Sequence, residues 1–344
     1  MIDPEKLRMD LEEVWTSLGH KAAEDGAGVM RACALTLIAV VDDGDDAAVL
    51  AQTLAELMRV HPSRAIVIRL SPGQGDLLEA GVEAQCWMPF GGRQQICSEQ
   101  IVIRSTDRTL AEVPGVVLPL VVADLPVVLW CPSDRAWRSG SFPALIEPAG
   151  RVIVDTSRAA DPARALRTLY EQYQASGGRL ADLSWTHLTR WRALVAQLFE
   201  NAFYRRLIPR LTAATIDYEG AAESPLPATA LLMAGWLGSR LGWPDGGRVR
   251  FRRVDARFGA GRLAAVELDA PHARITIGRT DRACGEVRGE VAGAEPLLKR
   301  VDLAPSDDAR LLSEELGIYD ADTVFAESLA RAAQPRYTDP RPAC

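Results

Sequence analysis

The chain has 344 residues, of which 48% are hydrophobic and 25% are charged, the composition of an ordinary soluble protein with one or two domains. Its net charge of −7 disfavours general binding to nucleic acid, which requires cationic side chains to neutralise phosphates. No stretch approaches the roughly 18 apolar residues of a membrane helix, and the polar N-terminus argues against a secretory signal. No membrane partner is therefore predicted, and the cytoplasm is the expected location.

The first half of the sequence alternates helical and extended patterns, which predicts an N-terminal α/β domain over residues 1–178. A helix that begins at Pro4 precedes a continuous apolar strand over residues 34–41, typical of a parallel strand buried on both faces. An acidic turn at residues 42–46 favours the start of a helix, and a strand over residues 65–70 completes a right-handed parallel unit. The other expected elements are a proline-interrupted helix over 106–122, strands over 126–131 and 151–155, and a helix over 162–175.

A hairpin is predicted between two extended stretches, residues 82–87 and 94–104, around a Gly-Gly turn at 91–92. If the turn is centred there, Cys86 stands opposite Cys97 at a Cα separation of about 5.5 Å, which is compatible with a disulfide. Two interpretations stay open for this possible redox pair. The cysteines are either reduced and partly buried, as is usual in a cytosolic protein, or joined by a reversible disulfide.

Beyond a glycine-rich stretch at 176–178, the sequence predicts a C-terminal α+β domain over residues 179–333 and a loose tail over residues 334–344. Alternating apolar residues and short turns predict an antiparallel meander in this domain. The fold class is therefore α/β, mixed α+β in the second half, with two sheet-containing domains flanked by helices. The expected elements are strands over 211–218, 248–258, 262–268, 273–279 and 284–291, and helices over 225–241, 306–316 and 322–332.

Two tryptophans, Trp185 and Trp191, lie six residues apart at the start of a strongly amphipathic segment. Apolar residues recur at helical spacing over residues 188–207, and Thr189 is expected to cap the helix by accepting a backbone N–H of its first turn. Tryptophan is enriched at interface hot spots, but it also commonly anchors a protein core. Both roles stay open for the two tryptophans.

Positive charge is concentrated in the second half of this acidic chain. Residues 245–300 contain 12 Arg or Lys against 8 Asp or Glu. Arg248, Arg250 and Arg252 alternate along one predicted strand, which indicates either a solvated strand face or a patch for an acidic protein or a phosphorylated metabolite. Together with Arg190, Arg192 and the two tryptophans, these arginines are the predicted partner-binding residues.

The usual motifs of catalysis and cofactor binding are missing from the sequence. No G-x-G-x-x-G follows a predicted strand, and neither a Walker A motif nor G-x-S-x-G occurs. The six cysteines and four histidines lack the spacing of a zinc site, and the aspartates at 42–46 suit a turn and a helix cap better than a divalent cation. We therefore predict no catalytic residues, no metal and no cofactor.

The segment D-L-S-W-T-H-L-T-R-W-R at residues 182–192, followed by A-Q-L-F at 196–199, is similar to the hallmark of the OpcA family of glucose-6-phosphate dehydrogenase assembly proteins. Further segments agree in the same order along nearly the whole chain. They lie at residues 40–43, 61–68, 99–103, 117–120, 125–130, 152–155 and 311–317. Two features depart from the family: Arg190 stands where many members have proline, and no cysteine matches the positions that connect cyanobacterial relatives to thioredoxin.

The resemblance implies a non-enzymatic partner that binds glucose-6-phosphate dehydrogenase, promotes its assembly into active oligomers and acts as its allosteric effector. Such a protein would support the oxidative pentose phosphate pathway. The residues themselves leave two other functions open: a binding protein for a small molecule such as a sugar phosphate or nucleotide, and an enzyme whose site is not recognisable from isolated residues. No oligomeric state is predicted for the chain itself.

Overall fold

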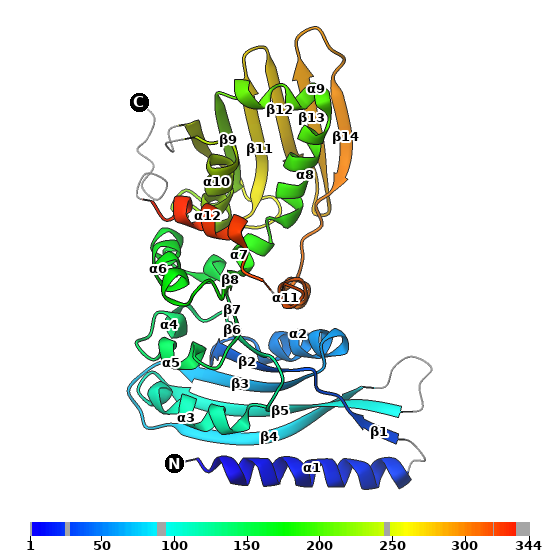
Figure 1. The fold of residues 1–344 in the computed structure, drawn as a ribbon, viewed down its shortest axis with the longest axis vertical. Helices are drawn as coiled ribbons and strands as arrows, with labels where there is room; N and C mark the ends of the chain where they lie inside the picture. Colours follow the sequence, from blue (N-terminus) through cyan, green and yellow to red (C-terminus); the bar gives the residue numbers. More distant parts are fainter. Residues whose placement is uncertain (1, 25–27, 88–93, 244–247, 319, 335–344) are drawn as a thin grey trace. The chain divides into compact units, whose positions relative to one another are not determined.

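The computed structural model describes residues 2–24, 28–87, 94–243, 248–318 and 320–334. The chain forms two compact units, the first comprising Met1–Val154 with Asp308–Gly317 and the second Asp155–Asp307 with Ile318–Cys344 (Figure 1). Residues 155–178, assigned from the sequence to the first domain, are thus part of the second unit, and the domain boundary at residue 178 remains a prediction. All but the first residue of the predicted tail, 334–344, lies outside the described residues.

The first unit contains a mainly parallel sheet with the neighbour order β1-β5-β3-β2-β6-β7. One strand, β4, pairs with β5 in the antiparallel direction, as predicted for the hairpin. The strands of this unit are β1 (Gly28–Arg31), β2 (Leu35–Asp42), β3 (Ser63–Ser71), β4 (Leu78–Trp87), β5 (Gln94–Thr106), β6 (Val127–Cys131) and β7 (Arg151–Val154). The predicted parallel pairing of the strands at 34–41 and 65–70 is confirmed by the register of β2 with β3.

A capping side chain and the prolines determine the ends of several helices in the first unit. Asp46 caps α2, because its side chain accepts hydrogen bonds from the amides of Ala48 at 2.8 Å and Val49 at 3.4 Å. The predicted helix over 106–122 is broken into three short pieces, as its prolines require. The helices are α1 (Pro4–Glu24), α2 (Ala47–Val60), η1 (Thr109–Glu112), α3 (Val113–Val117), η2 (Leu118–Leu120), α4 (Asp134–Trp137), α5 (Phe142–Ile146) and α11 (Asp308–Leu316).

Helix α1 is attached to the sheet by a buried polar contact. Trp15 Nε1 donates to Glu99 Oε1 at 2.8 Å, and the other oxygen of this buried carboxylate accepts from Arg64 Nε at 2.5 Å. The guanidinium and the indole N–H together compensate the cost of burying the Glu99 charge. The contact therefore fixes the position of α1 on the sheet.

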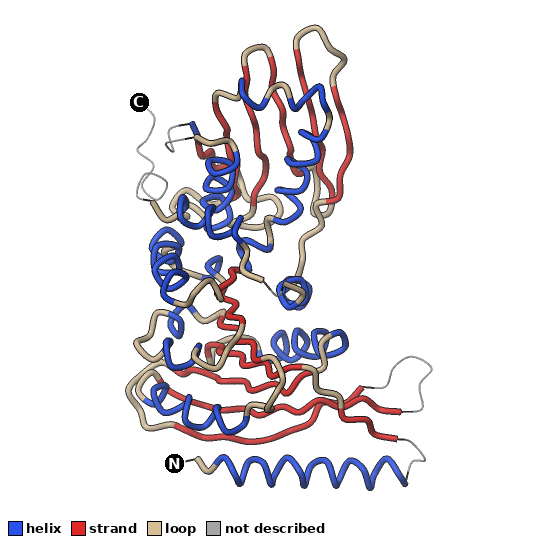
Figure 2. The backbone as a smooth tube through the Cα atoms, in the orientation of Figure 1, coloured by secondary structure: helices blue, strands red, loops and turns tan. Residues whose placement is uncertain are grey.

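The second unit contains a sheet with the order β10-β9-β11-β12-β13-β14. Strands are drawn in red in Figure 2. The prediction that the strand at 248–258 belongs to an antiparallel meander is wrong, since β10 pairs with β9 in parallel. The reason is the intervening helix α10, which returns the chain to the end from which β9 started. The strands are β9 (Ala213–Glu219), β10 (Val249–Val254), β11 (Leu263–Ala270), β12 (Ala273–Arg279), β13 (Cys284–Val291) and β14 (Leu297–Asp302).

Helices cover one face of this sheet, where α8 contacts β12 and α10 contacts β9 and β10 (Figure 1). The sheet residues turned toward them are buried and apolar, for example Ile216, Val266 and Ile277. The remaining elements of the unit are η3 (Thr156–Arg158), α6 (Pro162–Ala175), β8 (Leu180–Asp182), α7 (Leu183–Thr186), α8 (Thr189–Glu200), α9 (Ala202–Arg205), η4 (Ile208–Arg210), α10 (Ala228–Arg240) and α12 (Thr323–Ala332). The predicted α/β class, with two sheets flanked by helices, is confirmed. None of the described helices is both long and apolar enough to cross a membrane.

Candidate partner-binding surface

The face of the second sheet turned away from α8 and α10 is rich in charged side chains. Along each strand these side chains alternate with the buried apolar ones, because successive residues of a strand point to opposite faces. Register places Arg252 beside Asp217 on β9, Arg274 between Asp269 and Glu290, and Gly278 beside Glu286. We call this surface the charged face and define it by Asp217, Arg250, Arg252, Glu267, Asp269, Arg274, Thr276, Gly278, Glu286, Arg288 and Glu290.

Ion pairs join several side chains of the charged face. Arg252 donates to Asp217 at 2.5 Å and to Glu267 at 2.6 Å, and these hydrogen bonds raise the pKa of its guanidinium. Arg274 pairs with Asp269 at 2.7 Å. The Arg252 and Arg274 side chains are more than half exposed, although Asp217 is buried, so solvent weakens these pairs. The pairs nevertheless hold the charges in a defined pattern.

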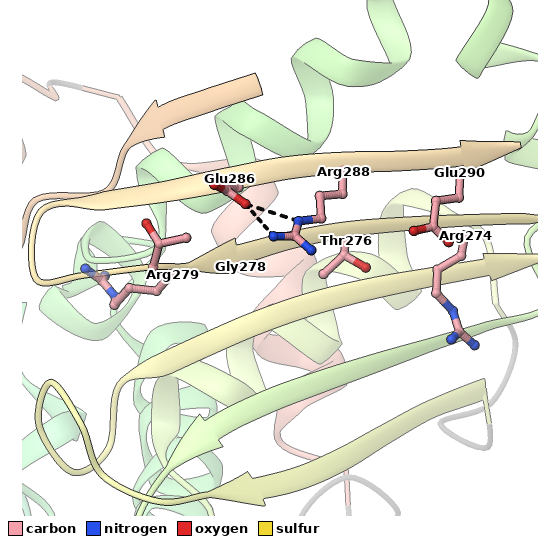
Figure 3. A pocket seen from close by; sticks show the side chains of 8 residues that line it. Arg274, Thr276, Gly278, Arg279, Glu286, Arg288 and Glu290 are labelled. Carbon is pink, nitrogen blue, oxygen red and sulfur yellow. Dashed lines mark hydrogen bonds and ion pairs between the residues drawn. The ribbon is translucent and has the colours of Figure 1, made fainter. Parts of the chain in front are cut away.

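Two neighbouring hollows lie on the charged face. The first, of about 290 Å³, contains the Arg288–Glu286 ion pair at 2.7 Å, with Thr276 and Gly278 on the adjacent strand β12 (Figure 3). The second, of about 470 Å³, shares Arg274 and Glu290 with the first and extends to the turns at the ends of β11, β12 and β13. Because Gly278 has no side chain, the sheet surface is low at this point and leaves room for a partner's side chains.

Of the predicted arginines, Arg250 and Arg252 lie on the charged face, and Arg248 precedes them at the start of β10. Arg250 is exposed and makes no hydrogen bond or ion pair within the described part of the chain. The Arg248 guanidinium lies 5.8 Å from the centre of the buried Trp243 ring. Of the five predicted arginines, the structure thus places Arg250 and Arg252 on the charged face.

The two tryptophans of the signature segment are buried, at 3% exposure for Trp185 and 4% for Trp191. Trp185 Nε1 donates to Asp322 Oδ2 at 2.8 Å, and the Trp185 ring packs on Phe325 of α12. The two indoles therefore belong to the core of the second unit. Replacing Trp185 or Trp191 would affect a partner only by changing the fold of this unit. The Arg192 guanidinium stacks 3.5 Å from the centre of the Trp185 ring.

The start of helix α8 differs from the prediction. The N-cap position belongs to Leu188, which makes no side-chain cap, so the prediction that Thr189 caps this helix is wrong. The chain is already helical before this point, because Asp182 caps the short α7 by accepting from the amide of Ser184. Arg190 pairs with Asp302, the last residue of β14.

Arg279 connects the signature segment with the charged face, and sequence reasoning did not single it out. Its guanidinium lies 6.0 Å from the centre of the Trp191 ring, donates to the carbonyl of Leu303 at 2.7 Å, and lines the smaller hollow. Burial lowers the pKa of the Arg279 guanidinium. The period-two alternation of Glu286, Arg288 and Glu290 marks the charged face, but Arg279 has the parity of the buried Ile277, so this signal could not have found it.

The predicted register of the hairpin is confirmed, since Cys86 stands directly opposite Cys97. Cys97 is fully buried and disulfide-bonded, whereas the side chain of Cys86 lies outside the described residues. The predicted redox pair remains a prediction. Within the described ranges, no group of three His, Cys, Asp or Glu residues is arranged to hold a metal ion.

Two family models match successive parts of the chain. Residues 54–171 match the glucose-6-phosphate dehydrogenase subunit N-terminal domain, and residues 179–329 match the corresponding C-terminal domain. The chain belongs to the OpcA family. The two matches together cover most of the sequence in the order that the family requires.

Relatives named for OpcA and the OxPP cycle agree with this assignment. One from Nostoc punctiforme is 27% identical over 311 residues, which cover 81% of this chain and 66% of the relative. One from Synechocystis is 32% identical over 182 residues, which cover 52% of this chain and 37% of the relative. The matches thus span less than two thirds of these relatives' own length.

Two solved structures match this chain at low sequence identity. The crystal structure of glucose-6-phosphate 1-dehydrogenase from Mycobacterium avium matches with a TM-score of 0.53 and 12% identity, over 89% of this chain and 93% of that chain. A 3-ketoreductase from Actinomadura kijaniata in complex with NADP matches with a TM-score of 0.46 and 12% identity, over 87% of this chain and 95% of that chain. The first likeness shows a common fold and nothing about activity.

Proposed function

We propose that this OpcA-family protein binds glucose-6-phosphate dehydrogenase, promotes its assembly into active oligomers and acts as its allosteric effector without catalysing the reaction itself. The observation that carries the proposal is the match of both halves of the chain to domains described as subunits of that dehydrogenase. The protein would then work beside the dehydrogenase in the cytoplasm, in the oxidative pentose phosphate pathway.

We assign the contact with the dehydrogenase to the charged face. Its side chains are fixed by ion pairs, yet Arg250 and Glu290 carry no ion pair in the described part of the chain and can bind opposite charges. The low strip around Gly278 and the adjoining hollows give a partner's side chains a place to enter. Arg190 and Arg192, both half-exposed, remain further candidates for the contact.

An effector must bind the active state of the enzyme more tightly than the inactive state, because equal affinity shifts no equilibrium. The test therefore titrates the dehydrogenase of the same organism with this protein while initial rate and complex mass are followed together. A saturable rise in rate that accompanies a complex is the expected result. No complex and no change in rate, with both proteins folded, would refute the proposal.

The charged face is tested in the same titration with Arg250→Glu combined with Arg288→Glu. Reversing two charges at a contact should weaken the complex roughly tenfold or more. Arg164→Glu is the matched control, since Arg164 is exposed on α6 of the same unit and lies outside the charged face. If the double variant is folded and activates like the control, the contact lies elsewhere.

The smaller hollow also supports a second candidate function, binding of a sugar phosphate or nucleotide. Arg274, Arg279 and Arg288 line a volume of about 290 Å³ and outnumber the two glutamates there. Each of the three arginines already has a partner in the fold, which makes this function the weaker candidate. A rise in melting temperature with glucose 6-phosphate in the absence of dehydrogenase would support it.

A further inference from the structure

The strand order of the first unit identifies the place where a sheet of this kind binds a dinucleotide. From β2 the chain steps outward through β3 to β5, and it then returns to the other side of β2 for β6 and β7. This is the order of a doubly wound sheet with its switch point between β2 and β6, at the carboxyl ends of the strands. In such sheets the pyrophosphate lies on the N-terminus of the helix that follows the first strand, which here is α2.

Side chains of the protein bridge this switch point. Asp42, the last residue of β2, accepts from Ser133 Oγ at 2.9 Å and from Arg135 Nη2 at 2.5 Å, and both donors follow β6. The same Arg135 nitrogen donates to the carbonyl of Leu70 at the end of β3 at 2.9 Å, and Arg135 Nε lies 3.7 Å from Asp107 after β5. Arg135 thus joins the carboxyl ends of four neighbouring strands.

The amides that would hold a phosphate are already used within the loop and the first turn of α2. The amide of Asp42 donates to the Asp45 carboxylate at 3.1 Å, that of Asp43 to Leu70, and that of Asp45 back to Asp42. At the helix N-terminus, Asp46 accepts from two amides and so takes the place of an anionic ligand. Few N–H groups in this loop are left for a phosphate.

The charges at this place would also repel a phosphate. Carboxylates stand at Asp42, Asp43, Asp45 and Asp46, whereas a dinucleotide site presents glycines so that the backbone can approach the pyrophosphate. Arg69 does not offset them for a ligand, because it donates to the carbonyls of the loop itself at 3.1 Å. A pyrophosphate would therefore lose hydration without finding donors in return.

We propose that the switch point of the first unit is a dinucleotide site closed by the protein's own side chains, in which Arg135 holds the strand ends together and Asp46 replaces the phosphate. The chain binds neither NADP+ nor NADPH at this place. Joined to the proposed function, on which this last step rests, the inference assigns the binding of NADP+ and NADPH at a switch point of this kind to the dehydrogenase subunits.

The test measures amide hydrogen exchange on the full chain without dehydrogenase, so its outcome does not depend on the proposed function. Millimolar NADPH should leave exchange over residues 42–49 unchanged. Arg135→Met should speed exchange of the amides of Asp42, Asp43 and Asp45 roughly three- to tenfold, because the strand ends lose a shared charged donor. Arg138→Met is the matched control, since Arg138 is a partly exposed arginine of the same loop region and pairs locally with Asp134.

Protection of residues 42–49 by NADPH in the unaltered protein would overturn the proposal. So would an Arg135→Met variant whose exchange in this loop equals that of the Arg138→Met control. Failure of the dehydrogenase to form a complex would refute the proposed function and leave the exchange result standing.

Discussion

Asp182 of the signature segment has a fully buried carboxyl group. It provides a test of whether burial keeps this group protonated in the folded protein. Its Oδ1 accepts from the amides of Thr156 and Ser184, both at 3.0 Å, and its Oδ2 lies 2.5 Å from Thr156 Oγ1. The hydroxyl of Thr156 also lies 3.0 Å from Ser184 Oγ, but it has a single proton to donate. A protonated Asp182 satisfies both contacts of the Thr156 hydroxyl. The carboxyl proton is then donated to Thr156 Oγ1, and the Thr156 proton is donated to Ser184 Oγ.

Burial raises the pKa of Asp182 from 3.8 to about 7, against the hydrogen bonds from Thr156, which lower it. The folded state therefore holds a proton that the unfolded chain releases above pH 3.8, so stability falls as pH rises and is lowest above pH 7. Each pH unit in this window corresponds to about 1.4 kcal/mol. Between about pH 5 and pH 8 this single group should lower the free energy of unfolding by about 3 kcal/mol.

The variant Asp182→Asn should remove this dependence. An asparagine can keep its oxygen toward the two amides and donate from its nitrogen to Thr156, so it resembles the protonated acid. Its stability should exceed that of the parent by about 2 kcal/mol at pH 5 and by about 4 kcal/mol at pH 8. Urea unfolding at a series of pH values measures the difference, in which all other titrating groups cancel.

Asp161→Asn is the control for this series, because Asp161 is an exposed N-cap that asparagine can replace. Its stability profile should run parallel to that of the parent. If the Asp182→Asn profile is parallel as well, Asp182 is charged in the folded protein and the reasoning from burial is wrong.

Two further variants test packing and the cysteine pair. Gly235→Ala should destabilise by about 1–3 kcal/mol in urea unfolding, since an added Cβ would lie 2.2 Å from the Ser328 carbonyl oxygen. Gly19→Ala, with open space around its position in α1, should instead stabilise by about 0.5–1 kcal/mol, and equal effects of the two would contradict the close approach of α10 and α12. Cys97→Ser should lower stability by about 2–3 kcal/mol more under oxidising than under reducing conditions, as expected for loss of a disulfide, which closes a short loop if the partner is the predicted Cys86. The same loss in both conditions would show that the disulfide contributes nothing.

Local features of the fold were predictable where one residue or one periodic pattern decides the outcome. Asp161 before Pro162 predicted the start of α6, and Asp322 caps α12 at the predicted position. The hairpin register also followed from its turn, because the pairing of every residue is then determined by counting. In contrast, β1 is only four residues long and β14 has mostly exposed side chains, so neither shows the apolar alternation that predicts a strand.

The candidate site was less predictable, because it is made by strand order. Asp217 and Arg252 meet only because β10 turns out to lie beside β9, a pairing that hydrophobic periodicity does not specify. Arg288 and Arg274 are near each other through the antiparallel register of β12 and β13. The sequence showed an excess of arginine, whereas the structure shows that carboxylates from neighbouring strands accompany it.

The tryptophans of the signature show why unusual residues in a sequence do not by themselves mark a contact surface. A large side chain with one N–H group can fill a core and also bind an acid at its edge, and Trp185 does both by donating to the half-buried Asp322. A buried position that also needs an N–H donor restricts the choice of residue as strongly as a contact with a partner would. The exposed charges of the sheet tolerate many substitutions without unfolding, so loss of activation there, and not at Trp185, would locate the contact with the dehydrogenase.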